Sequence, residues 1–136
     1  MNERITWWYN TSENDLRAAR ILAQSGDYAN AVFHCQQAVE KILKAYLLSL
    51  RVTSQTHSCI DLLEMVERNS DLTVSERLKS DARKLDLQYI PTRYPNGLGG
   101  DPSRYYDRIL WEELSVCAER IFQFIQPSLE QMRSRD

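Results

Sequence analysis

The sequence predicts an all-α protein, an up-and-down bundle of four to five helices formed by a single domain over residues 1–136. Three observations lead to this fold class. Apolar residues recur at three- and four-residue spacing over most of the chain, no segment sustains the two-residue alternation of strands, and glycine and proline punctuate the periodic segments. A chain of 136 residues that is 43% hydrophobic can bury a core without disulfide or metal staples.

The first two helices are the longest periodic segments. One helix is expected from about Glu3 to Gln24, because Gly26 can then adopt the left-handed conformation that ends many helices. Asp27 provides an N-cap for a second helix, whose apolar pattern continues for more than six turns up to Leu50. We expect this second helix to lie at the centre of the bundle.

Two shorter helices follow a polar connection, RVTSQTH. The first is expected over residues 58–69. The second is expected to begin at Thr73 and Glu76, which have the spacing of a capping box, and to run to about Tyr89. Pro91 should end it, because the residue before a proline disfavours helical geometry.

A last helix is expected after a long irregular segment, IPTRYPNGLGGD. It should begin at Asp101-Pro102 and continue to about Gln126, where Pro127 kinks or ends it. Its apolar residues cover about two thirds of the helix circumference: Tyr106, Ile109, Leu110, Trp111, Leu114, Val116, Cys117, Ala118, Ile121, Phe122, Phe124 and Ile125. A homodimer through this helix, about a two-fold axis, would cover its second side, and enclosure by other helices of the same chain is the alternative.

Charge and composition exclude several classes of protein. The net charge of -2 gives no global positive field that would attract nucleic acid. No apolar run reaches the roughly eighteen residues of a membrane span, and MNERITWW lacks a secretory pattern. The cysteines, Cys35, Cys59 and Cys117, suit reduced thiols, and two distant histidines specify no metal site. We therefore expect a cytoplasmic protein that contacts no membrane and uses no metal or other cofactor.

Candidate nucleotide-binding residues lie in the irregular segment. Arg93 and Tyr94 stand between two prolines, which restrict the backbone and lower the entropy lost on presenting a guanidinium and a ring. Such a pair can hold a phosphate and stack on a base. Alternatively, Tyr94 fills a hydrophobic gap and Arg93 pairs with Asp86 or Asp101.

His57, Lys41 and Lys44 are candidates for further polar contacts with a nucleotide. His57 precedes a helix N-terminus, whose dipole favours the neutral ring, and a neutral ring can hydrogen-bond a phosphate or a hydroxyl. The two lysines lie with Gln36 along the polar side of the second helix. This side is either a groove for a partner or an anion, or a solvated stripe with a Glu40–Lys44 ion pair.

Three segments resemble the HEPN domain of prokaryotic nucleotide-binding proteins: DYANAVFHCQQAVEKILKAYLLSLRV, THSCIDLL and LDLQYIPTRYP, in this order. The resemblance covers nearly the whole chain. It implies an all-α bundle with an additional short helix, frequent homodimerisation and gene pairing with minimal nucleotidyltransferases. It also implies nucleotide binding or, in one branch, metal-independent cleavage of RNA.

The ribonuclease branch uses an arginine and a histidine that are separated by four to six residues. No histidine follows Arg93 in this way, whereas Arg51 and His57 have the spacing at a different place in the chain. We expect a nucleotide-binding or partner subunit of a toxin–antitoxin-like pair. The alternatives are a ribonuclease toxin, with His57 as acid or base and Arg51 stabilising the phosphorane, and a structural dimeric interaction module.

Overall fold

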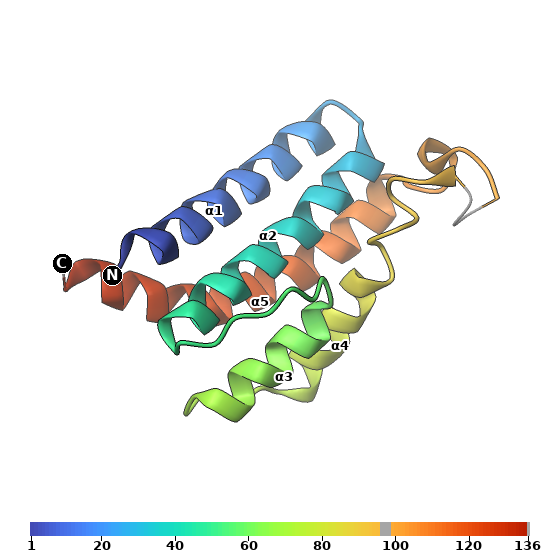
Figure 1. Cartoon of the computed structure of the whole chain (residues 1–136). Coiled ribbons are helices and arrows are strands. Elements are labelled where there is room, and N and C mark those ends of the chain that lie inside the picture. The colour runs from blue at the N-terminus through green and yellow to red at the C-terminus, as the bar shows by residue number, and fades with distance from the viewer. Residues whose placement is uncertain (96–98, 136) are drawn as a thin grey trace.

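The computed structural model describes residues 1–95 and 99–135, which form five α-helices and one short 3₁₀-helix. Two long helices, α1 (Glu3–Gln24) and α2 (Tyr28–Ser49), form one pair, and α3 (Cys59–Asn69) and α4 (Glu76–Asp86) form a shorter pair. The last helix, α5 (Arg108–Ser134), packs along α2 and α4 (Figure 1). The described residues contain no strand, and the predicted all-α bundle is confirmed.

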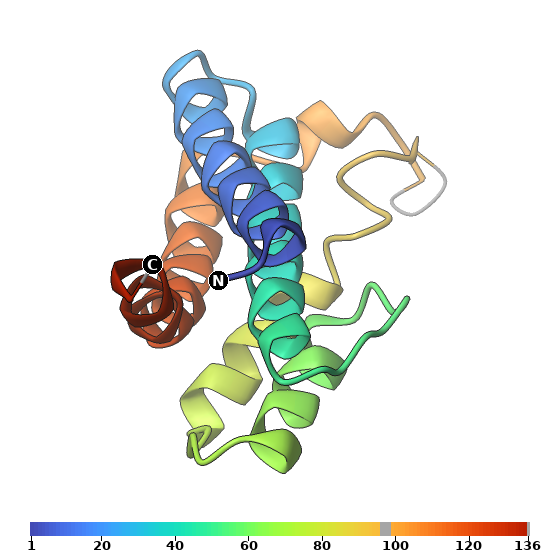
Figure 2. The ribbon, with the colours of Figure 1, turned by 60° about the vertical axis from the view of Figure 1, so that its left-hand side comes forward.

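The connection between α2 and α3 runs back along α2, so α3 has the same direction as α2 (Figure 1). The other consecutive helices alternate in direction. Figure 2 shows α1 and the α3–α4 pair on opposite sides of α2, with α5 on a third side. The two long connections, before α3 and after α4, both lie on the remaining side of α2 (Figure 2), and the rings of His57 and Tyr89, one from each connection, stack on one another.

The α2 helix is the centre of the hydrophobic core, as predicted. Its fully buried side chains include Ile42 and Leu43, and burial of each such side chain contributes about 1.5–3 kcal/mol. Two polar residues, Gln36 and Glu40, are also buried on α2, at 0% and 4% exposure. Because buried polar groups need partners, these two positions indicate where the connections are tied to the helix.

Each α-helix begins at a polar side chain that accepts a backbone N–H three residues later. The caps are Asn2, Asp27, Ser58, Ser75 and Asp107. The predicted cap of α4 at Thr73 is wrong, since the side chain of Ser75 accepts from Leu78 and the helix begins at Glu76. Ser75 is the residue that directly precedes the first helical turn, which is where a capping hydroxyl must lie.

The predicted end of α4 and start of α5 are also wrong. The α4 helix ends at Asp86 and turns occupy residues 87–93, so Pro91 lies beyond the helix and does not terminate it. Asp101 and Pro102 begin only a single 3₁₀ turn, η2 (Pro102–Arg104). A second cap, at Asp107, starts α5. Residues 96–98 of the irregular segment lie outside the described residues.

Pro127 lies inside α5, which continues to Ser134. Contacts with α1 explain why the helix does not end there. Leu129 is fully buried, and the hydroxyl of Tyr9 donates to a carboxylate oxygen of Glu130 at 2.5 Å. These interactions beyond the proline offset the single backbone hydrogen bond that proline removes.

The apolar surface left uncovered on α5 is narrower than the predicted arc. Most of the apolar residues are buried against this chain's own helices, whereas Ile109 and Val116 are 75% and 48% exposed. Leu87, just after α4, is 71% exposed, and Lys84 of α4 lies 3.9 Å from Glu113 of α5. No described helix is both long and apolar enough to cross a membrane.

Candidate functional site

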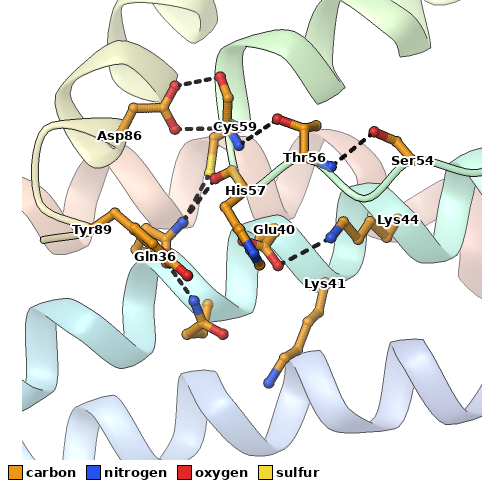
Figure 3. Close-up of polar contacts among 12 residues, drawn as sticks. Gln36, Glu40, Lys41, Lys44, Ser54, Thr56, His57, Cys59, Asp86 and Tyr89 are labelled. Atoms are coloured by element: carbon orange, nitrogen blue, oxygen red, sulfur yellow. Dashed lines mark hydrogen bonds and ion pairs between the residues drawn. The ribbon is translucent and has the colours of Figure 1, made fainter.

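The α2–α3 connection is fixed on both sides of His57. The Nε2 of Gln36 donates to the backbone carbonyl of His57 at 3.3 Å. Asp86, at the end of α4, accepts the backbone N–H group of Cys59 at 2.5 Å (Figure 3) and that of Ile60 at 3.1 Å. A carboxylate at the positive end of α3 satisfies donors that the helix itself leaves unpaired. His57 is therefore held in a defined place against α2.

The ring of His57 contacts a carboxylate and an aromatic ring. Its Nδ1 lies 3.0 Å from Oε1 of Glu40, and it stacks on Tyr89 with ring centroids 5.0 Å apart. The other oxygen of Glu40 accepts from Lys44 at 3.3 Å (Figure 3). A carboxylate facing Nδ1 favours a proton there and leaves Nε2 as the acceptor of the neutral ring. The His57 side chain is 57% exposed, so it is open to a ligand.

The guanidinium of Arg93 lies over three aromatic rings. Its central carbon is 4.4, 4.8 and 5.1 Å from the ring centroids of Tyr89, Phe33 and Tyr94. The Nε of Arg93 donates to the backbone carbonyl of Tyr89 at 3.2 Å. The rings hold the guanidinium in place without neutralising its charge.

Among the described residues, no carboxylate forms an ion pair with Arg93. The two partners considered from the sequence are engaged elsewhere, since Asp86 accepts backbone N–H groups at the start of α3 and Asp101 accepts from Ser103. Tyr94 is 46% exposed and therefore does not fill a gap in the core. The positive charge of Arg93 is left available to an anion.

Tyr89 joins these features into one site, which we call the Arg93 cluster: Phe33, His57, Tyr89, Arg93 and Tyr94. His57 comes from the connection before α3, and Arg93 comes from the turns after α4. Both touch the ring of Tyr89. A cation, a half-exposed imidazole and an exposed phenol ring together suit a ligand that carries both a negative charge and an aromatic face.

The structure does not bring every predicted residue to this cluster. Lys41 pairs with Asp15 of α1 at 2.6 Å, and Figure 3 shows it pointing away from His57. Lys44 reaches the site through Glu40. Arg51 is exposed at the end of α2, and no hydrogen bond, ion pair or ring contact within the described part of the chain joins it to His57.

Two residues of the Arg93 cluster, Tyr89 and Phe33, were missed at the level of sequence, as was the role of Glu40 in facing His57. Tyr89 precedes Arg93 by four residues, and this spacing on a helical turn was the available signal. Phe33 and Glu40 carried no such signal for their roles, because their contacts are made with segments distant along the chain.

The cysteine nearest the cluster, Cys59, is not placed for nucleophilic chemistry. It is fully buried, and burial together with nearby Asp86 raises the pKa of its thiol well above the ordinary value. A thiol reacts as its thiolate, so Cys59 stays unreactive. All three cysteines are free and buried, as predicted, and the described residues contain no group of ligands that could hold a metal ion.

The fold and this site define an all-α protein in which two connections meet over one face of a central helix. Comparison with known proteins shows that the chain belongs to the HEPN domain family, whose model matches residues 5–129. A protein of Methanocaldococcus jannaschii named "Putative toxin MJ1304" is 27% identical over 128 residues, which cover 88% of this chain and 84% of that protein.

Two solved structures have the same fold. The crystal structure of TT1696 from Thermus thermophilus is 36% identical, with a TM-score of 0.86, and the match covers 93% of this chain and 98% of that one. The structure of ST0689, described as an archaeal HEPN homologue, is 30% identical, with a TM-score of 0.77 and the same coverage.

Proposed function

We propose that this chain is the nucleotide-binding subunit of a cytoplasmic toxin–antitoxin-like pair and acts together with a minimal nucleotidyltransferase. Arg93 holds a phosphate and Tyr94 stacks on the base. His57 and Lys44 add polar contacts. Membership of the HEPN family and similarity to a protein named as a toxin support the pairing.

The single observation that carries this proposal is the environment of Arg93. Its guanidinium is positioned by three rings and by the carbonyl of Tyr89, and no described carboxylate neutralises it. A structural arginine of a protein surface usually contributes through an ion pair, as Arg120 does with Asp81 in this chain. Arg93 is instead preorganised for a phosphate, which lowers the entropic cost of binding.

Calorimetric titration with purine nucleotides tests the proposal. We expect salt-sensitive binding in the micromolar to millimolar range, as befits a small set of polar contacts. Arg93→Ala should weaken it by at least about 1 kcal/mol, roughly fivefold, through loss of a charge-assisted hydrogen bond. Arg93→Lys should restore little of this affinity, because an ammonium lacks the planar fork that stacks on rings.

Arg83→Ala is the matched control, since Arg83 is an exposed arginine on the neighbouring α4. It should leave nucleotide affinity within about twofold of the wild type, because a distant exposed charge is screened by solvent. Equal affinity in wild type and Arg93→Ala, or no binding of any nucleotide, would contradict the proposed site.

We also propose that the protein forms a homodimer through α5 and binds the nucleotidyltransferase as a second partner. The exposed Ile109 and Val116 support the dimer, because a stable interface needs apolar residues at its centre. A gene for a nucleotidyltransferase beside the gene for this chain, and copurification of the two products, would establish the partner. If the neighbouring gene and the copurifying protein are both absent, the alternative that the chain is a structural dimeric interaction module is favoured.

Metal-independent cleavage of RNA is a second candidate, favoured by the contact between His57 and Glu40. A carboxylate that orients an imidazole is a common arrangement in acid–base catalysis. The predicted partner Arg51 makes no contact with His57 in the described residues, so we expect the chain alone to leave structured RNA uncut in EDTA. Loss of cleavage by at least about a hundredfold in both His57→Ala and Arg51→Ala would instead identify a catalytic pair.

A further inference from the structure

Two neighbouring hollows beside the start of α1 share the side chain of Trp8. The larger, of about 420 Å³, lies between α1, the end of α2 and the connection that follows, and its lining includes Arg4, Trp8 and Lys44. The smaller, of about 360 Å³, is lined by Trp7, Trp8, Thr11 and Lys41. Both volumes fall in the range of small-molecule sites.

The side chains of these hollows combine aromatic faces with positive charge. Trp7 is 57% exposed, and the ammonium of Lys44 lies 5.7 Å from the ring centroid of Trp8. The described residues that line the hollows include three cations and no carboxylate. Two of the cations are paired with carboxylates from outside the lining, Lys41 with Asp15 and Lys44 with Glu40, whereas Arg4 has no such partner within the described residues.

The larger hollow and the Arg93 cluster lie along one face of α2. Phe33, Glu40 and Lys44 recur at helical spacing on this face, and they contact Arg93, His57 and Trp8 respectively. Lys44 lies eleven positions after Phe33, which corresponds to about 16 Å along a helix. A nucleoside monophosphate is shorter than this distance, whereas a strand of several nucleotides can span it.

We propose that the surface formed by Arg4, Trp7, Trp8, Lys41 and Lys44, which we call the tryptophan platform, binds single-stranded nucleic acid. Bases stack on the two indoles, and the cations hold the backbone phosphates. Stacking on aromatic side chains beside a cationic groove tolerates any base sequence. The proposal rests on the proposed function in one respect, since it makes the nucleotide at Arg93 one residue of a longer strand. The platform can bind a strand even if no nucleotide binds at Arg93.

Fluorescence anisotropy of labelled single strands of about 12 nucleotides, within the site sizes of ~4–16 nucleotides known for such grooves, tests the platform. Trp7→Ala should weaken binding at least about fivefold, the lower end of the loss expected for one stacked base. Ile21→Ala is its control, because Ile21 is equally exposed, at 59%, on the same helix and outside both hollows.

Arg4→Gln should also weaken strand binding and reduce its dependence on salt, because one phosphate contact is lost. Arg17→Gln makes the same change of charge on α1 outside the platform and should have no such effect. The affinities for RNA and DNA strands with the same base order should be compared. Both strands share phosphates and base faces, so a difference in affinity reports recognition of the 2′-hydroxyl.

The two sites are distinguished by their responses. If the platform is correct, Trp7→Ala and Arg4→Gln weaken the strand and leave a mononucleotide unaffected, whatever Arg93→Ala does. If Arg93→Ala weakens both ligands while the platform variants match their controls, the proposed function stands and the platform is wrong. Inorganic polyphosphate carries negative charge but no bases. If it displaces the labelled strand as well as an unlabelled strand does, stacking of bases on the tryptophan platform is wrong.

Discussion

Asp86 positions the Arg93 cluster without belonging to it. Its carboxylate accepts two backbone N–H groups at the start of α3 and the hydroxyl of Ser58 at 2.9 Å. Because His57 directly precedes Ser58, the same contacts fix the imidazole over α2. The residue also marks the end of α4, where the turns that carry Tyr89 and Arg93 begin. One side chain thus places both segments of the site.

The buried cysteines give the protein a specific response to alkaline pH. Burial raises the pKa of Cys35 from an ordinary value of 9.0 to about 12 and that of Cys117 to about 11. Above pH 9 the unfolded chain releases these protons while the folded chain retains them. The stability that the thiols contribute is therefore fully present below pH 9 and is lost as pH rises toward 12.

We expect the free energy of unfolding to fall more steeply above pH 9 in the wild type than in Cys35→Ala. Each retained proton contributes a slope of about 1.4 kcal/mol per pH unit over the window between the two pKa values. Urea denaturation at a series of pH values measures this slope. Identical slopes in the two proteins between pH 9 and 11 would show that the Cys35 thiol ionises as readily in the folded state.

At the scale of the elements, a buried ion pair joins α4 to α5. Both nitrogens of the Arg120 fork reach the carboxylate of Asp81, at 2.7 and 2.9 Å. The Asp81 side chain is fully buried, whereas that of Arg120 is 40% exposed. Because Asp81 belongs to α4 and Arg120 to α5, the ion pair fixes α4, and the turns that follow α4, relative to α5.

Arg120→Ala should destabilise the protein by about 2–3 kcal/mol, because it leaves a buried carboxylate without its cation. This value is below the 3–5 kcal/mol typical of fully enclosed pairs, since solvent reaches Arg120 and screens the interaction. Chemical denaturation measures the loss. The double variant Asp81→Ala/Arg120→Ala serves as the comparison, and a single variant no less stable than the double variant would refute the cost of an unpaired charge.

At the scale of the whole molecule, the exposed apolar residues of α5 and the turn after α4 identify the face through which two copies would pack. Ile109 and Val116 lie two helical turns apart on α5, and the exposed Leu87 directly follows α4, which packs against α5. This surface is small, so polar residues around it must contribute to a stable dimer. The α5 helix lies on the opposite side of α2 from the two connections that carry His57 and Arg93 (Figure 2).

Light scattering after size exclusion should give about twice the 15.9 kDa mass of one chain. Val116→Glu should yield a folded monomer, because a charge buried in the interface costs several kcal/mol if it is unpaired. Ile21→Glu is the control on an exposed apolar position of α1, and it should remain dimeric. A wild type that elutes as a monomer at micromolar concentration excludes the dimer.

The periodic spacing of apolar residues by itself determined the helices and the central position of α2. The limits of α1 and the start of α2 were predicted correctly, because their caps are adjacent to a long amphipathic pattern. Thr73 and Pro91 misled the prediction for α4, since both are plausible signals and Ser75 competes locally for the cap. Thr73 and Ser75 both carry a hydroxyl that could cap the helix. The backbone conformation of the folded chain decides which of the two does so.

The site itself was decided by tertiary structure. Sequence patterns indicated Arg93, Tyr94 and His57 as candidates, but nothing in their spacing predicted that Tyr89 lies between two of them. They meet because the connection before α3 turns back along α2 and the turns after α4 approach the same face. Helix periodicity is a local property of the chain, whereas contacts between distant segments depend on how whole helices pack.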